Sequence, residues 1–202
     1  PILTEEARLA GFTNERGVDD RIRFLHNVMG LWMLTECVRD WEGDGDTIDL
    51  SALLAHAAAI DTTMPLFDAN DPAFLAPGGM PGRICAWFRE RGEAAPTSRA
   101  ELARSIIASL AAAHARAIHA AAELSGTHVH AVHIVGGGSR NALLCQLTAD
   151  ATGLPVLAGP AEATSIGNLL VQARAHGALN GDLETLRAAV AAAFPPARYE
   201  PR

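Results

Sequence analysis

The second half of the sequence alternates strand-like and helix-like segments, and this order limits the folds that the chain can adopt. Residues 129–135 are rich in branched side chains, and the glycines at 136–138 separate them from a helical pattern that continues to residue 151. A second strand-like segment covers residues 154–157, and residues 162–176 return to helical spacing. Strands that alternate with helices pair in parallel, since only a crossover reaches a parallel neighbour. The sequence therefore predicts a helix-rich α/β fold whose two strands form an incomplete sheet.

The longest predicted helix covers residues 98–125, where one apolar stripe continues from Leu102 to Leu124. Ser98 and Glu101 have the spacing of a capping box, and Gly126 is expected to end the helix. Further helices are predicted over residues 4–10, 21–41, 50–60, 84–88 and 182–194. In the helix at 162–176, four side chains are expected to face the interior: Ile166, Leu169, Leu170 and Ala173.

The sequence changes character near residue 96. Before this point, helical segments alternate with loops rich in Gly, Pro and Asp, and residues 61–81 are expected to be irregular. We therefore expect a single domain over residues 1–202, with a helical and loop part at 1–96 and an α/β part at 97–202.

Composition excludes several kinds of chemistry. All 16 basic residues are arginine, so a phosphate-binding P-loop lysine, a protein-kinase lysine and Schiff-base catalysis are all ruled out. With 23 acidic residues the formal charge is −7, which disfavours nucleic acid and anionic membranes as partners.

The three cysteines indicate the compartment. Cys37, Cys85 and Cys145 are widely spaced, and each lies in a predicted helix, so we expect small buried side chains in a reducing, cytoplasmic environment. The apolar stretch at residues 105–115 is far shorter than the roughly 20 residues of a membrane-spanning helix. The chain begins with Pro1 and has no signal peptide pattern, so we expect that a sequence upstream of it has been left out.

The glycine loop, Gly136 to Gly138, is the main candidate for a binding site. Three residues without Cβ atoms between a strand and a helix let a ligand lie against the backbone, and the amides of the helix start favour a phosphate. This pattern favours a nucleotide. A tight turn with Ser139 as the helix N-cap explains the same residues equally well. Asn141 breaks the dinucleotide pattern GxGxxG; it either contacts a ribose or base edge or is a second capping residue.

Two polar residues of the helix predicted at 21–41 are further candidates. Asn27 and Thr35 are nearly two turns apart and would lie on the same side of that helix. An asparagine among apolar residues is locally unfavourable and often indicates a site, although a solvent-facing position is the alternative.

The histidines give no strong metal pattern. In an extended segment, His128 and His130 lie on one face and His133 on the other, so the three do not form a ligand set. Glu162 and Asp150 could act as bases, but the sequence identifies no partner for either of them.

Four segments together resemble the C-terminal domain of the FGGY carbohydrate kinases. They are FTNE at 12–15, HNVMGLW at 26–32, VHIVGGGSRN at 132–141 and GPAEATSIGN at 159–168. The resemblance implies the second actin-like, ribonuclease-H-like ATPase domain of a two-domain enzyme. It further implies that ATP, with Mg²⁺, binds in the cleft between the domains, with residues 1–96 near the sugar and 97–202 near the adenosine.

The resemblance also assigns expected roles to individual residues. The segment from Gly136 to Asn141 matches the adenosine motif, in which Gly137 and Asn141 are expected at the adenine and ribose. Asn27 matches a position on the sugar side of the cleft. Thr35 replaces a glutamine that usually contacts the nucleotide, and threonine is shorter. Residues 162–167 match a connecting helix whose small residues allow close packing against the other domain.

The implied reaction is transfer of the γ-phosphoryl group of ATP to the primary hydroxyl of L-rhamnulose, giving the 1-phosphate. The general-base aspartate and both phosphate loops are expected upstream of Pro1, so no catalytic residue is assigned here and the chain alone is expected to be inactive. A kinase for another ketose or a polyol, and a non-catalytic nucleotide-binding module, remain alternatives.

Overall fold

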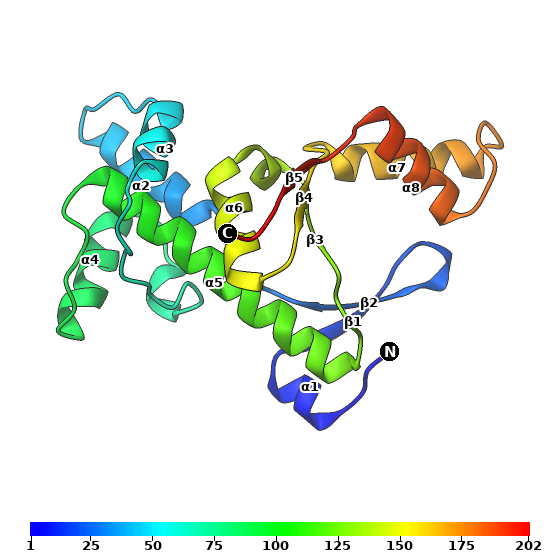
Figure 1. Cartoon of the computed structure of the whole chain (residues 1–202), viewed down its shortest axis with the longest axis horizontal. Coiled ribbons are helices and arrows are strands. Elements are labelled where there is room, and N and C mark those ends of the chain that lie inside the picture. Colours follow the sequence, from blue (N-terminus) through cyan, green and yellow to red (C-terminus); the bar gives the residue numbers. More distant parts are fainter. The chain divides into compact units, whose positions relative to one another are not determined.

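A three-stranded sheet carries the glycine loop. In the computed structural model, which describes residues 1–202, strands β3 (Val132–Ile134) and β4 (Val156–Ala158) pair in parallel, as predicted, although β3 is shorter than the predicted segment and β4 begins later. Strand β5 (Ala197–Tyr199) lies antiparallel on the other side of β4 (Figure 1). This third strand was not predicted, because three residues after two prolines give too short a pattern.

Helix α6 (Ala142–Thr152) packs against this sheet. Cys145 and Ala149 of the helix form a buried cluster with Val156 and Ala158 of β4. Val132, Ile134 and Tyr199 pack against the cluster from the two outer strands. The small side chains of α6 let the helix lie close to the sheet, so the start of the helix is held next to the end of β3.

The prediction of one helix over residues 21–41 was wrong. Residues 22–26 form strand β2 (Ile22–His26), which pairs antiparallel with strand β1 (Phe12–Arg16), and helix α2 (Trp32–Gly43) begins later. The rings of Phe12 and Phe24 stack across the hairpin at 4.6 Å. A helical pattern at residues 22–28 therefore gave way to cross-strand pairing, which depends on a segment ten residues away in sequence.

The chain forms two compact units. Their bounds differ from those of the two parts, 1–96 and 97–202, that the sequence suggests. The first unit contains residues 1–27 and 118–202, and the second contains residues 28–117. Helix α5 (Arg99–Ser125) begins in the second unit and ends in the first. Its predicted capping box is confirmed: the Glu101 amide donates to Ser98 Oγ at 3.1 Å, and the Ser98 amide donates to Glu101 Oε2 at 3.2 Å. Gly126, with φ of 63°, follows the last turn.

The second unit is helical around an aromatic core. Its other elements are α2, α3 (Leu50–Ala58), the 3₁₀ turn η2 (Pro72–Phe74) and α4 (Met80–Glu90). The helices predicted at 50–60 and 84–88 are confirmed as α3 and α4, whereas η2 and the start of α4 lie in the segment 61–81 that was expected to be irregular. Phe67, Phe74 and Phe88 are buried, and the ring of Phe67 contacts each of the other two edge to face. Glu36 of α2 is buried as well, and its carboxylate accepts hydrogen bonds from Arg39 and from the Gly78 amide.

The cysteines lie on helices as expected. Cys37 and Cys145 are buried, Cys85 is half-buried, and all three are free thiols. Burial raises the pKa of the Cys37 thiol to about 12 and that of Cys145 to about 11, so both remain protonated near neutral pH. They therefore act as small packing residues.

The remaining helices lie in the first unit. They are α1 (Glu5–Leu9), α7 (Ala163–Ala175) and α8 (Leu183–Ala193), all within predicted segments. The expected inward stripe of α7 was wrong for Leu169, whose side chain is 67% exposed, and no residue of α7 is buried. The side of α7 that carries Ile166 and Leu170 borders a groove instead of a filled core, and Leu169 does not line that groove. None of the helices combines the length and apolar character that crossing a membrane requires.

Candidate functional site

The glycine loop joins the end of β3 to the start of α6. The 3₁₀ turn η3 (Gly137–Arg140) follows Gly136 and leads into the helix. The Gly136 amide donates to the Pro160 carbonyl at 3.2 Å, and the Gly159 amide donates to the Ile134 carbonyl at 2.8 Å. The connection after β4 therefore fixes the position of the loop, and the loop forms the edge of the first unit where β3 ends.

The three glycines differ in what their own conformation requires. Gly136 has a φ of 76°, which favours glycine on backbone grounds. Gly137 and Gly138 lie outside the left-handed region, and a Cβ atom would meet nothing within 4 Å at Gly137 and only ordinary contacts of 3.7 and 3.8 Å at Gly138. The fold would therefore accept a side chain at either position. Their glycines leave an open backbone surface of the kind that a flat ligand can cover.

The loop also presents free hydrogen-bond donors. The backbone amides of Gly137 and Gly138 donate to no other group of the protein, and Gly137 is exposed. The first turn of α6 adds partial positive charge at the same place. These N–H groups suit a ligand that carries hydrogen-bond acceptors or negative charge and that approaches the backbone closely.

Asn141 is the N-cap of α6, so the prediction of Ser139 in that role was wrong. The Leu144 amide donates to Asn141 Oδ1 at 3.0 Å, and the residue is only 7% exposed. Ser139 instead donates from Oγ to the Gly136 carbonyl at 2.7 Å and closes the loop. The 3₁₀ turn moves the helix start two residues further along, which the spacing did not show. The capping alternative for Asn141 is thus confirmed, while its Nδ2 group donates to no protein atom and stays available to a ligand.

Asn27 and Thr35 do not share a helix. Asn27 is exposed in the segment that follows β2, and Thr35 is exposed on α2, where its hydroxyl donates to the Leu31 carbonyl at 3.3 Å. The hairpin that replaces the first part of the predicted helix separates the two residues. Asn27 and the glycine loop belong to the first unit, and Thr35 belongs to the second.

The two acidic candidates have structural partners. Glu162 pairs with Arg140, the last residue of η3, at 3.5 Å, and Asp150 Oδ1 accepts hydrogen bonds from the Gln146 side chain and the Arg202 amide. The Arg140–Glu162 pair could not be found from sequence, because nothing local relates residues 22 positions apart. Asp150 is therefore engaged in packing the C-terminus, the Arg140–Glu162 pair is exposed, and neither carboxylate is assigned a catalytic role.

The three histidines considered as metal ligands lie before β3 or on it. His128 and His130 precede the strand, with ring centroids 4.5 Å apart, and His133 is exposed on β3 itself. No three His, Cys, Asp or Glu side chains come together as a metal site would require. The glycine loop with Asn141 is thus the place where the structure gathers predicted site residues: Gly136, Gly137, Gly138 and Asn141.

Comparison with known proteins agrees with the sequence pattern. Residues 1–176 match the model for the FGGY family of carbohydrate kinases, C-terminal domain. The chain is 42% identical over 202 residues to a rhamnulokinase of Pectobacterium carotovorum subsp. carotovorum and 41% identical to that of Pectobacterium atrosepticum. A rhamnulokinase of Bacteroides thetaiotaomicron is 36% identical. Each alignment covers all of this chain but only 40%, 40% and 41% of the relative, respectively, so the chain spans about two fifths of the length of these curated relatives.

Proposed function

Because the chain belongs to the C-terminal domain family of the FGGY carbohydrate kinases, we propose that it is the adenosine-binding half of an ATP-dependent sugar kinase. The proposed reaction transfers the γ-phosphoryl group of ATP to L-rhamnulose and yields L-rhamnulose 1-phosphate. This choice of sugar is supported by the name rhamnulokinase of relatives that are 36–42% identical over the whole chain.

The proposal depends most on the glycine loop. Neither the backbone conformation nor the packing of the protein requires glycine at positions 137 and 138. A nucleoside that lies directly on the backbone does require it, since a Cβ atom would occupy the space of the base or ribose. The open surface, the free amides and the unused Nδ2 of Asn141 together fit an adenosine moiety.

Each predicted site residue then has a proposed role. Gly136 shapes the loop, Gly137 and Gly138 lie under the adenosine, and Asn141 donates from Nδ2 to the ribose or base. Asn27 contacts the sugar side, and Thr35 contacts the nucleotide less extensively than a longer side chain would. Bound ATP supplies the phosphoryl group, and Mg²⁺ neutralises charge on its phosphates.

The rest of the machinery is proposed to lie on the remaining three fifths of the parent protein. Phosphoryl transfer depends on positioning the attacking hydroxyl, a base and the phosphates in one geometry. Residues 1–202 form one domain in this proposal, their partner is the N-terminal kinase domain, and the chain alone is inactive. A cytoplasmic location is supported by the three free cysteines.

The Asn141 side chain can be tested for its two roles separately. Asn141→Asp keeps the oxygen that caps α6 but removes the Nδ2 donor, so we expect unchanged stability and about tenfold weaker nucleoside binding from the loss of one hydrogen bond. Asn141→Ala loses both groups, and its free energy of unfolding should also fall by about 1 kcal/mol. Urea denaturation measures the stability, and calorimetric titration with ADP measures the binding.

Adenosine is the control ligand, because it has no phosphate that the new carboxylate of Asn141→Asp could repel. Wild-type affinity of Asn141→Asp for adenosine would show that Nδ2 contacts no ligand. Failure of the wild-type chain to bind ADP or adenosine at millimolar concentration would count against the proposed function itself.

A further inference from the structure

Helices α7 and α8 have little packing of their own. No residue of α7 is buried, and Leu186 is the only buried residue of α8. The two helices border a groove of about 810 Å³ whose lining is mostly apolar and which also includes His133, Val135 and Val18. Hydrophobic contact alone therefore holds this helix pair weakly, and other interactions must contribute to its position.

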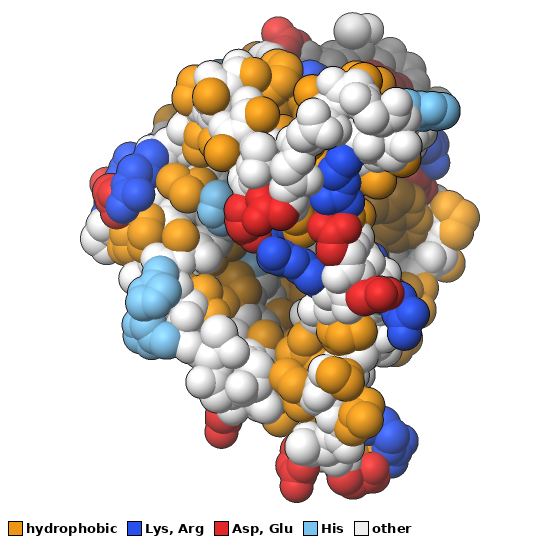
Figure 2. All heavy atoms as spheres, turned by 90° about the vertical axis from the view of Figure 1, so that its right-hand side faces the viewer, with side chains coloured by type: hydrophobic (Ala, Val, Ile, Leu, Met, Phe, Trp, Pro, Cys, Tyr) orange, Lys and Arg blue, Asp and Glu red, His pale blue; other side chains and the backbone are white.

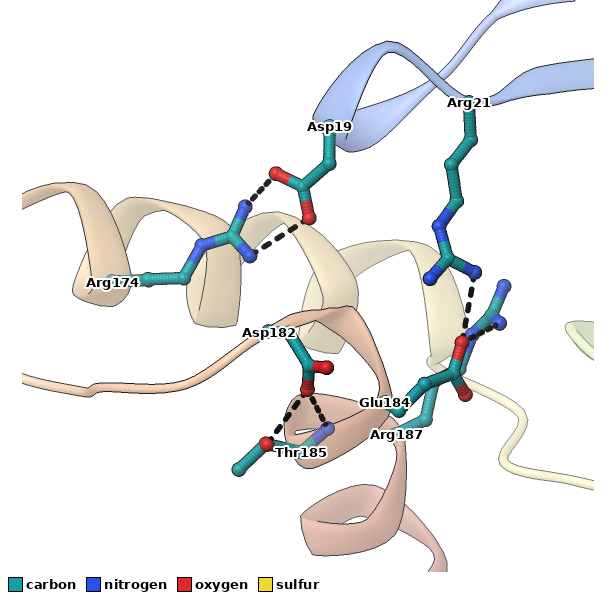
Figure 3. Close-up of polar contacts among 7 residues, drawn as sticks. All are labelled: Asp19, Arg21, Arg174, Asp182, Glu184, Thr185 and Arg187. Carbon is teal, nitrogen blue, oxygen red and sulfur yellow. Dashed lines mark hydrogen bonds and ion pairs between the residues drawn. The ribbon is translucent and has the colours of Figure 1, made fainter.

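Ion pairs join both helices to the tip of the β1–β2 hairpin. Asp19 accepts two hydrogen bonds from the Arg174 guanidinium of α7, at 2.7 and 3.0 Å (Figure 3). Arg21, two residues further along, donates to Glu184 of α8 at 2.8 Å, and Arg187 donates to the same carboxylate oxygen at 3.0 Å. We call the pairs Asp19–Arg174 and Arg21–Glu184 the clasp.

The Asp19–Arg174 pair of the clasp is better formed than a typical surface ion pair, whereas Arg21 and Glu184 are about half exposed. Arg174 is bidentate and its side chain is only 22% exposed, which fixes its geometry and limits screening by solvent. The Arg174 guanidinium holds the pKa of the Asp19 carboxyl below its usual value. Figure 2 shows acidic and basic side chains next to one another on this face, between areas of hydrophobic and uncharged atoms.

The hairpin tip is shaped to present these charges. Asp19 and Asp20 are the only residues other than glycine with positive φ, at 58° and 56°. Aspartate tolerates this left-handed conformation better than most residues, but two in succession are unusual. The conformation directs Asp19 toward α7 (Figure 3), so the ion pair offsets a local backbone strain.

The residues just before the opposite end of α7 contact the glycine loop. The Pro160 carbonyl accepts a hydrogen bond from the Gly136 amide at 3.2 Å, and Glu162, the residue before the helix, pairs with Arg140 at 3.5 Å, with about 70% of each side chain exposed. Helix α7 is thus tied to the candidate nucleotide loop at its N-terminus and to the hairpin tip near its C-terminus. Helix α7, of 13 residues, is therefore the single regular element that joins these two contacts.

We propose that Asp19 and Arg174, supported by Arg21 and Glu184, are positioning residues that hold α7 and thereby the nucleotide loop in its binding geometry. The expected effect on nucleotide affinity rests on the proposed function. The expected effect of the clasp on the order of α7 and α8 does not depend on it. When the clasp opens, α7 and α8 become mobile, and nucleotide binding must restore their order. Affinity then falls without any change in the groups that contact the nucleotide.

A double-mutant cycle on the full chain tests the clasp. Asp19→Asn tolerates the same backbone conformation but removes the charge, and Arg174→Gln removes the partner. Hydrogen exchange of residues 163–193, followed by mass spectrometry, should become about three- to tenfold faster in either variant, as expected for the loss of a partly buried ion pair. The double variant should be no worse than the single ones, because both remove the same interaction. Each variant should also bind ADP about threefold more weakly.

Arg23→Gln is the matched control, since it removes an ion pair with Glu15 that lies within the same hairpin and touches neither helix. It should leave the exchange of residues 163–193 and ADP affinity unchanged. Raising salt to about 0.5 M should speed exchange of α7 in the wild-type chain by weakening the clasp, which requires no mutant to fold. If the effects of Asp19→Asn and Arg174→Gln on hydrogen exchange add up in the double variant, the two residues do not act as a pair and the clasp is overturned. The same follows if hydrogen exchange of α7 is unchanged in both variants and at high salt. Faster exchange with unchanged ADP affinity would overturn its link to the loop, whereas absent ADP binding by the wild-type chain would instead contradict the proposed function.

Discussion

Replacing Gly137 by tryptophan should lower the affinity of the chain for ADP by at least about 30-fold, which corresponds to about 2 kcal/mol of binding free energy. The indole would extend from the exposed loop into the space that we propose for the adenosine. The fold itself should tolerate the change, because Gly137 is outside the left-handed region and a Cβ atom meets nothing within 4 Å. The unfolding midpoint in urea is therefore expected to stay close to that of the wild type, and calorimetry should report the loss of binding.

Gly43→Trp is the control for an added indole. Gly43, at the end of α2, has equally open surroundings and no positive φ, but it is outside the glycine loop. This variant should bind ADP like the wild type. Equal ADP affinity of Gly137→Trp and Gly43→Trp would show that the nucleotide does not lie on the loop.

The second large effect concerns the stability of the helical unit. Phe88→Ala should lower the free energy of unfolding by about 3–5 kcal/mol, because it removes a large buried side chain and leaves a cavity. Phe88 is fully buried, and its ring lies 5.9 Å from that of Phe67 and 5.3 Å from that of Trp87, both edge to face. Urea denaturation followed by circular dichroism measures the change.

Phe194→Ala provides the matched control, since the Phe194 side chain is 49% exposed at the end of α8. The same atoms are removed there without a closed core around them, and the loss should remain below about 1 kcal/mol. Similar losses for the two variants would mean that the aromatic cluster is not the core of the second unit.

Sequence patterns predicted those elements whose signals are local. The helix at residues 98–125 was found together with its capping box because an apolar stripe and the pair Ser98 and Glu101 lie within one segment. The parallel pairing of β3 and β4 followed from their alternation with helices. Helical spacing at residues 21–41 was misleading, because the strand Ile22–His26 is stabilised by a partner strand rather than by its own periodicity.

The candidate site shows the same limit. The glycine loop was identified from its composition, but the 3₁₀ turn that makes Asn141 the N-cap in place of Ser139 depends on hydrogen bonds within the folded loop. The clasp joins Asp19 to a residue 155 positions later, which no spacing rule can predict. A helix or a glycine loop can thus be predicted from the residues of its own segment. The contacts that position these elements depend on the tertiary fold and cannot.

A chimeric enzyme tests the central claim most directly. Residues 1–202 would replace the aligned two fifths of the Pectobacterium carotovorum rhamnulokinase, and ATP-dependent phosphorylation would be measured with L-rhamnulose and with a panel of other ketoses and polyols. We expect activity with L-rhamnulose in the chimera, a large loss when the chimera carries Gly137→Trp, and none from residues 1–202 alone. A chimera that folds and binds the sugar but transfers no phosphate, or one whose activity ignores Gly137→Trp, would contradict the assignment of this chain as the adenosine-binding half of the kinase.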